Sequence, residues 1–200
     1  MSDKIYPVPK ISNLVPLMSE EKYSELYKLS LDNPNKFWGE EALSRLNWIK
    51  PFDDVLSTNM EEAEFEWFSN GKLNACFNCV DRHLENNGNK IAFIWESDDG
   101  STSKKITYQE LYEEVCRFSN LLKSRGIKKG DRVCIYMPMI LEAIYSMLAC
   151  ARIGAVHSVV FGGFSVESLK DRILDSDCQT IITANEGLRG GKKIPLKRNV

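Results

Sequence analysis

Two apolar segments on either side of an apolar helical pattern constrain the fold of this chain more than any other feature. Residues 132–137 are short, mainly apolar and followed by Pro138, which is typical of a strand buried on both faces. Apolar residues then recur at helical spacing up to Gly154, and a second, β-branched strand follows at 156–161. A strand, a crossover helix and a strand form a right-handed parallel unit. The stretch 130–165 therefore predicts an α/β domain.

The neighbouring residues extend this unit in both directions. Ser165 is a good N-cap with Glu167 in the first turn of a helix, and residues 179–183 form the next strand. Upstream, residues 90–96 and 104–107 predict an antiparallel hairpin. The expected fold class is therefore α/β: an N-terminal helical and extended region, then part of a doubly wound, mainly parallel sheet with an antiparallel hairpin.

Helix boundaries can be predicted at four further places. Helices should begin after Ser19 and at Asn33-Pro34, and Thr107 with Glu110 forms a capping box at the start of another. Residues 73–84 are also expected to be helical, with Cys79 and Val80 near one face. Residues 1 to about 16 should be extended because their prolines oppose helix.

Aromatic residues accumulate in a polar, loop-like region before residue 73. They are Trp48, Phe52, Phe65, Trp67 and Phe68. We interpret them as pinning the N-terminal segment onto the main body; an exposed aromatic interaction surface is the alternative. The predicted domains are residues 1–72, the helical and aromatic-rich region, and residues 73–200, the first part of a larger α/β domain.

Composition excludes several classes of protein. The formal net charge of −2 gives no general attraction to nucleic acid or to an anionic membrane. No apolar run approaches transmembrane length, and the N-terminus lacks the apolar core of a signal peptide. A cytoplasmic protein is expected, with the nucleus as an additional location. Cys134 and Cys150 fall in apolar elements and should be reduced packing residues, while Cys76 and Cys79 lack the second pair that a zinc site needs.

The first candidate ligand-binding segment is the turn Phe161-Gly162-Gly163, where the second strand ends. A ligand can approach the glycine backbone closely because no Cβ blocks it. Ligands of α/β proteins bind beyond the carboxyl ends of parallel strands. The alternative is that these glycines only permit a tight strand-to-helix turn.

The second candidate segment combines two glycines with three cations. Its members are Arg189, Gly190, Gly191, Lys192 and Lys193. Backbone N–H groups at the glycines suit an anion, and Arg189 can hold two phosphate oxygens. The segment is not a Walker A loop, because Glu186 stands where that motif needs Gly and Lys193 where it needs Ser or Thr. A flexible, solvated basic loop is the alternative. Both segments follow strands of one sheet, so together they predict a nucleotide-like site.

Catalytic residues do not stand out. His83 and His157 are the only histidines, and His157 at the start of a strand is expected to be structural. No Ser/His/Asp pattern, carboxylate pair or metal-ligand cluster is visible. We therefore assign no catalytic residue and no metal ligand.

Four segments closely resemble the acetyl-CoA synthetase family, the AMP-forming acetate–CoA ligases of the adenylate-forming superfamily. They are KLNACFNCVDRHL, ITYQELYEEVCRFSNLLKSRGIKKGDRVCIYMPM, EAIYSMLACARIGAVHSVVFGGFS and EGLRGGKKIPLK. The region FWGEEALSRLNWIKPFDDVL resembles the aromatic-rich N-terminal part of that family less specifically.

The resemblance implies a two-step reaction and a set of substrates. Acetate and ATP form acetyl-adenylate and pyrophosphate, and the thiol of coenzyme A then displaces AMP. Family residues that contact the 3′-phospho-ADP part of coenzyme A map onto Phe161, Gly162, Gly163, Arg189 and Lys192. The implied partners are these small molecules and the remainder of the ligase, with no nucleic acid and no membrane.

The resemblance places several functional parts of the family outside these 200 residues. The ATP-phosphate loop, the acetate pocket and the catalytic lysine are expected beyond Val200. Mg²⁺ is expected for the complete enzyme, with no ligand in this segment. The chain is thus expected to be an N-terminal segment that is inactive alone. Alternatives are a propionate or other short-chain acyl-CoA ligase, a non-catalytic module that binds coenzyme A, or a fragment that does not fold stably.

Overall fold

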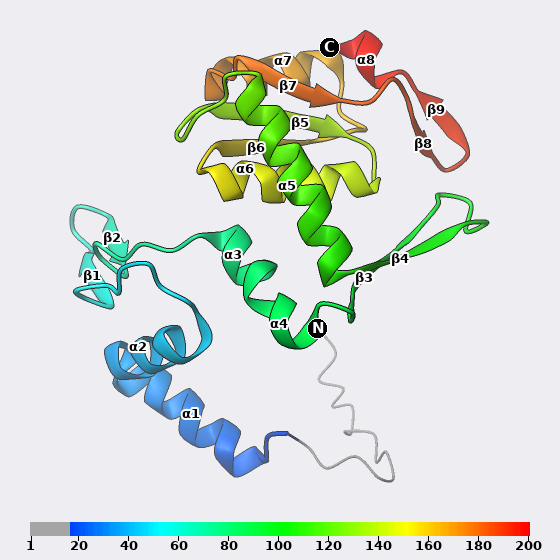
Figure 1. Ribbon diagram of the computed structural model, residues 1–200. Helices are drawn as coiled ribbons and strands as arrows, with labels where there is room; N and C mark the ends of the chain where they lie inside the picture. The colour runs from blue at the N-terminus through cyan, green and yellow to red at the C-terminus, as the bar shows by residue number, and fades with distance from the viewer. Residues whose placement is uncertain (1–16) are drawn as a thin grey trace, which may run out of the picture. The chain divides into compact units, whose positions relative to one another are not determined.

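The computed structural model describes residues 17–200, which belong to two compact units (Figure 1). Unit 1 contains residues up to Leu46 together with Lys50–Gly71, and unit 2 contains Asn47–Ile49 and Lys72–Val200. The extended segment expected over residues 1 to about 16 lies outside the described residues. The predicted domain boundary after residue 72 stays a prediction.

Two helices of unit 1 begin where the capping residues predict. Helix α1 spans Glu20–Asp32 and helix α2 spans Pro34–Arg45. The side-chain oxygens of Ser19 and Asn33 each accept a hydrogen bond from the backbone N–H three residues later, at 3.2 and 3.1 Å. Each cap satisfies one of the N–H groups that a helix start leaves unpaired, so both predicted starts are confirmed.

The aromatic region of unit 1 contains a β-hairpin, and the prediction of a loop there was wrong. Strands β1 (Leu56–Asn59) and β2 (Glu64–Trp67) pair antiparallel. The second strand, EFEW, alternates charged and aromatic residues, which is the period of a strand. The Trp67 ring then packs edge-on against Trp38 of α2, with centroids 6.2 Å apart.

The helix expected over residues 73–84 is broken into three short helices. They are α3 (Ala75–Cys79), the 3-10 helix η1 (Asp81–His83) and α4 (Leu84–Asn87). Val80 interrupts the run, since its backbone leaves the helical region at φ −126° and ψ −67° while its side chain is fully buried. The predicted shared face was wrong as well, because Cys79 is exposed.

A short stretch before residue 50 is bound to unit 2 by hydrogen bonds. The buried Asn78 side chain accepts from the Asn47 N–H at 2.8 Å and donates to the Asn47 carbonyl at 3.0 Å. The Ile49 N–H donates to the Lys72 carbonyl at 2.7 Å. These three bonds explain why Asn47–Ile49 group with unit 2 rather than with the residues on either side.

The hairpin and the capped helix predicted upstream of the parallel sheet are confirmed. Strands β3 (Ile91–Glu96) and β4 (Ser103–Thr107) pair antiparallel, and α5 (Tyr108–Ser124) follows directly. Thr107 Oγ1 accepts from the Glu110 N–H at 3.2 Å while the Glu110 carboxylate accepts from the Thr107 N–H at 2.8 Å. This reciprocal pair is the predicted capping box.

The parallel sheet has the doubly wound order that the sequence predicts. Its chain order is β5 (Arg132–Met137), α6 (Leu141–Ile153), β6 (Val156–Phe161), α7 (Val166–Ser176) and β7 (Thr180–Thr183). Strand β5 is central, and β6 and β7 pair with it in parallel from opposite sides. Alternate β5 residues enter two cores: Val133 packs with α5 and α6, and Tyr136 with Leu169 of α7. The expected burial of β5 on both faces is confirmed.

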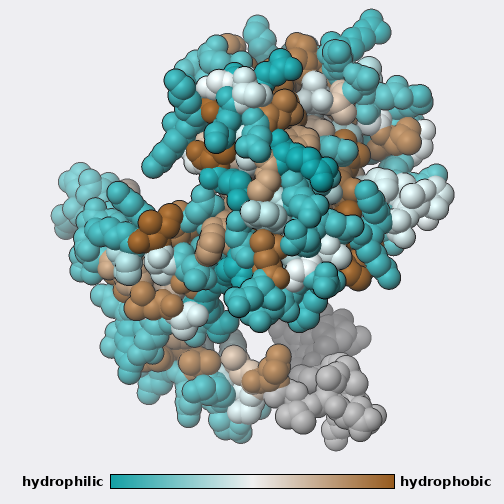
Figure 2. Space-filling view, in the orientation of Figure 1, coloured by the Kyte–Doolittle hydropathy of each residue, from teal (hydrophilic) through white to brown (hydrophobic). Residues whose placement is uncertain are grey.

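The basic tail contains a short hairpin, and its residues 189–193 are exposed. Strands β8 (Gly187–Arg189) and β9 (Lys192–Ile194) form a hairpin, and α8 (Leu196–Asn199) follows. Figure 1 shows this red hairpin beside the green hairpin β3–β4 in unit 2. In the hydropathy view of Figure 2, hydrophilic residues cover most of the visible face, with apolar residues interspersed among them. None of the helices within residues 17–200 combines the length and apolar character needed to cross a bilayer.

Candidate functional site

The glycine turn lies at the carboxyl end of β6, as predicted. A Cβ on Gly162 would approach the Met137 carbonyl oxygen to 3.2 Å, so this glycine lets two strand ends lie close together. The Tyr136 hydroxyl donates to the Phe164 carbonyl at 3.3 Å and accepts from the Asn199 side-chain amide at 3.1 Å. Residues of β5 and α8 therefore hold the turn in place.

Arg189 and Phe161 face each other across this turn. The guanidinium carbon of Arg189 lies 4.7 Å from the centre of the Phe161 ring, which is a cation–π distance. A Cβ on Gly163 would collide with Arg189 Nη1 and would lie 2.7 Å from Phe161 Cε1. The two candidate segments of the sequence thus form one surface, and Gly163 leaves the space in which the guanidinium sits.

Two residues outside the predicted site residues complete this surface. The Phe164 ring packs edge-on against Phe161 at 5.7 Å, and the guanidinium carbon of Arg172, from α7, lies 5.2 Å from the centre of the Phe164 ring. Two aromatic rings are therefore flanked by two arginines. Phe161 and Phe164 are partly exposed, so their edges and the cations remain accessible to a ligand.

The second candidate segment is a tight hairpin turn. Gly190 and Gly191 have φ values of 56° and 73°, and positive φ at both central residues is the requirement of a type I′ turn. Arg189 and Lys192 are direct cross-strand partners, so their side chains leave the same face. Lys193 leaves the other face, and its ammonium binds the Glu186 carboxylate at 2.7 Å. A Gly-Gly pair between short apolar-containing segments was the sequence signal for this hairpin.

Asp98, in the turn between β3 and β4, binds the backbone N–H groups of the β8–β9 turn. Its Oδ1 accepts from the Gly190 N–H at 3.1 Å and its Oδ2 from the Gly191 N–H at 2.9 Å. From the sequence we expected these two N–H groups to bind an anion of the ligand. Sequence reasoning missed this contact, because the partners are separated by 92 and 93 residues and no local pattern links them.

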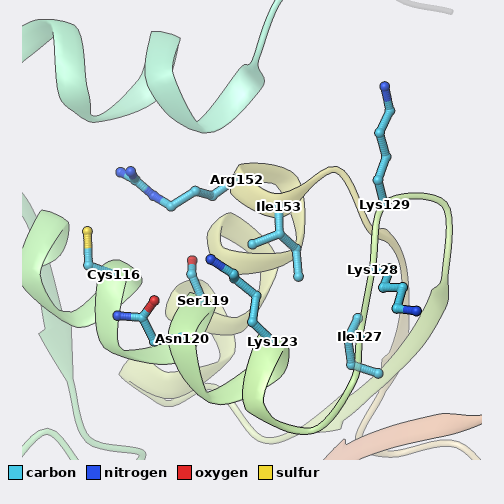
Figure 3. Close-up of a pocket in the computed structure, with 9 residues that line it drawn as sticks. All are labelled: Cys116, Ser119, Asn120, Lys123, Ile127, Lys128, Lys129, Arg152 and Ile153. Carbon is cyan, nitrogen blue, oxygen red and sulfur yellow. The ribbon is translucent and has the colours of Figure 1, made fainter.

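A cavity of about 570 Å³ lies away from this surface, next to α5 and α6 (Figure 3). Its cations do not converge: Figure 3 shows Lys128 and Lys129 pointing away from Lys123 and Arg152. Arg152 is also bound to the Asp81 carboxylate at 2.6 Å. The cavity adjoins the segments that precede β5 and β6, whereas ligands of such sheets bind at the opposite, carboxyl ends of the strands.

The remaining residues considered in the sequence have structural surroundings. His157 is half-buried in β6, and burial lowers its pKa. Cys134 and Cys150 are buried as expected, and burial raises the pKa of each thiol to about 11. Within residues 17–200, no three His, Cys, Asp or Glu side chains are grouped so that they could hold a metal ion.

The doubly wound sheet agrees with comparisons to known families. Residues 80–199 match the AMP-binding enzyme family, and residues 23–79 match the family described as acetyl-coenzyme A synthetase N-terminus. Because the first match covers more than half of the chain, the chain belongs to the AMP-binding enzyme family.

Individual relatives are more specific. The chain is 57% identical over 196 residues to acetyl-coenzyme A synthetase 2 of Pseudomonas aeruginosa. The aligned region covers 98% of this chain and 30% of that protein. It is 54% identical over 201 residues to acetyl-coenzyme A synthetase of Magnetococcus marinus, which covers 100% of this chain and 31% of that protein. The chain therefore spans about a third of the length of these curated relatives. Both are bacterial proteins and give no support to a nuclear location.

Proposed function

We propose that this chain is the N-terminal part of an AMP-forming acetate–CoA ligase. Such a ligase converts acetate and ATP to acetyl-adenylate and pyrophosphate, and then transfers the acetyl group to the thiol of coenzyme A with release of AMP. The proposal is supported by 54–57% identity to acetyl-coenzyme A synthetases over essentially the whole chain. ATP, acetate, coenzyme A and Mg²⁺ are then ligands of the complete protein, and a cytoplasmic location is part of the same proposal.

Within this chain, the proposed role is to bind the nucleotide part of coenzyme A. The observation that carries this role is the contact between Arg189 and Phe161 over the glycine turn Gly162-Gly163. An adenine or ribose can lie against the aromatic edge, and the guanidinium can donate two hydrogen bonds to phosphate oxygens. Lys192 adds a second cation on the same face of the hairpin.

The test compares two neighbouring cations in the complete protein that carries this chain. Arg189→Ala should raise KM for coenzyme A about 10- to 100-fold, because a hydrogen bond to a charged group contributes about 1.5–3 kcal/mol. KM for ATP and for acetate should change less than twofold. Lys193→Ala is the matched control, since Lys193 is bound to Glu186 on the other face.

Two outcomes contradict the proposed role. Equal increases in all three KM values would indicate a general folding defect rather than a coenzyme A site. An unchanged KM for coenzyme A would remove Arg189 from the site.

Measuring turnover with acetate and with propionate in the same assay separates an acetate ligase from a ligase of longer acids.

A further inference from the structure

The contact between Asp98 and the hairpin turn is a two-pronged one. Each carboxylate oxygen of Asp98 accepts one backbone N–H, from Gly190 at 3.1 Å and from Gly191 at 2.9 Å. Hydrogen bonds to an ionised acceptor are about twice as strong as neutral ones. The contact therefore ties the tip of β8–β9 firmly to the β3–β4 turn.

The turn amides need a partner from outside the hairpin. The β8–β9 ladder pairs Gly187 with Ile194, Leu188 with Lys193 and Arg189 with Lys192. The two glycines between these strands project their N–H groups away from the ladder. A carboxylate that accepts a hydrogen bond from each N–H group takes the place of the water or anion that would otherwise bind there.

The direction of Arg189 depends on this tie. A hairpin with three residues in each strand has little packing of its own to fix its orientation. Arg189 is the residue directly before Gly190, so movement of the turn moves the base of the arginine side chain. Its guanidinium must nevertheless reach the Phe161 ring beside Gly163.

The charge of Asp98 bears on whether its carboxylate stays on the turn amides, as a brace, or is displaced from them by a phosphate of the ligand. If phosphate displaced Asp98 from the amides, two anions would have to lie near each other at the turn, which is unfavourable. Among residues 17–200, the carboxylate of Asp98 forms no ion pair with Arg189 or Lys192. Both cations are thus left to interact with phosphate while Asp98 stays in place.

We infer, resting on the proposed coenzyme A site, that Asp98 is a positioning residue for that site. The carboxylate holds the Gly190 and Gly191 amides, and this contact aims the Arg189 guanidinium across Phe161. The phosphates of the ligand are taken by the side chains of Arg189 and Lys192 rather than by the backbone of the turn.

The experiment uses Asp98→Asn and Asp98→Ala in the complete protein. Asn keeps one acceptor oxygen but points an amide donor at the other N–H, and Ala removes both acceptors. KM for coenzyme A should rise about tenfold for Asn and further for Ala, while kcat and KM for ATP stay within twofold. Hydrogen–deuterium exchange of residues 187–194, measured without ligand, should become faster in the same order.

Asp99→Asn is the matched control, because it makes the same change in the same turn. The Asp99 carboxylate accepts hydrogen bonds within its own hairpin, from Ser97 Oγ at 2.6 Å, the Ser101 N–H at 3.0 Å and Ser101 Oγ at 2.8 Å. It should leave KM for coenzyme A and exchange of residues 187–194 unchanged. A control that raises KM as much as Asp98→Asn would show that any disturbance of the β3–β4 turn suffices, and would overturn the specific role of Asp98.

The remaining outcomes separate this inference from the proposed function. If Arg189→Ala raises KM for coenzyme A and Asp98→Asn does not, the brace is wrong and the coenzyme A site stands. If Asp98→Asn lowers KM for coenzyme A, the carboxylate competes with the ligand and the brace is also wrong. If Arg189→Ala has no effect on this KM while exchange at 187–194 still responds to Asp98→Asn, the coenzyme A site itself fails, and the inferred role in binding fails with it.

Discussion

The guanidinium carbon of Arg189 lies 4.7 Å from the centre of the Phe161 ring, and the two residues come from different strands of unit 2. Phe161 is the last residue of β6, and Arg189 is the last residue of β8. Their contact depends on the absence of a side chain at Gly163, which lies between them. The surface at the carboxyl edge therefore has a steric requirement as well as a chemical one.

Gly163→Ala should weaken the binding of coenzyme A without unfolding the protein. The new methyl group would meet the flexible end of Arg189 and the Phe161 ring, so both side chains have to move while the backbone can stay. We expect KM for coenzyme A to rise about tenfold, the loss of roughly one hydrogen bond to a charged group. Steady-state kinetics on the complete protein measures this change.

A double-mutant cycle with Arg189→Ala provides the control. If Gly163→Ala acts mainly by displacing the arginine, its effect on KM should be smaller once that side chain is gone, and only the contact of the methyl group with the Phe161 ring should remain. Additive effects of the two substitutions would instead show that Gly163 and Arg189 act independently, and would contradict the steric explanation.

Cysteine reactivity should divide between exposed and buried thiols. The thiolate is the reactive form, and burial raises the pKa of Cys76, Cys134 and Cys150 to about 11. Cys79 is exposed on α3. Alkylation at neutral pH, followed by peptide mass spectrometry, should therefore label Cys79 well before the three buried thiols, which should react only after denaturation.

Cys79→Ser is the control for this experiment and should remove the rapid phase of labelling. Labelling of Cys134 or Cys150 in native buffer at the rate seen for Cys79 would show that the parallel sheet opens readily. It would then contradict the burial of these residues in the two cores.

The capping box at the start of α5 should make stability depend on pH. The backbone N–H of Thr107, and then its hydroxyl, lower the pKa of Glu110 below its ordinary value of 4.5. A carboxyl whose pKa is lowered by folding adds stability that is present above pH 4.5 and is lost as the pH falls through the lowered value. The stability difference between the wild type and Glu110→Gln should therefore be largest near neutral pH and should shrink in acid.

Urea unfolding at a series of pH values measures this difference. Glu113→Gln, on the same helix but outside the cap, is the comparison and should not reproduce the trend. A difference between wild type and Glu110→Gln that stays constant from neutral pH to below 4 would show that the charge of Glu110 does not matter to the cap.

Local signals in the sequence were sufficient for most of unit 2. A capping box is formed by residues three positions apart, and a buried strand shows its apolar run directly, so Thr107, Glu110 and residues 132–137 could be predicted. The surface formed by Phe161 and Arg189 was also predictable in outline, because the carboxyl ends of parallel strands meet at one edge of the sheet.

Long-range contacts explain what the sequence did not predict. The helix pattern over residues 73–84 is real, but tertiary burial of Val80 takes precedence over local propensity and breaks it. The contact from Asp98 to Gly190 spans 92 residues, and no spacing rule applies at that distance. The strand EFEW does alternate, but over only four residues, which is too short for the period to stand out in a polar region.

The three hydrogen bonds that attach Asn47–Ile49 to unit 2 have a practical consequence for anyone who shortens this protein. A version that starts at residue 72 looks like a clean removal of the first unit. It would also delete the partner of the buried Asn78 amide and the donor to the Lys72 carbonyl. Retaining residues 47–49, for instance by replacing 50–71 with a short glycine-rich connection, would keep those polar groups satisfied.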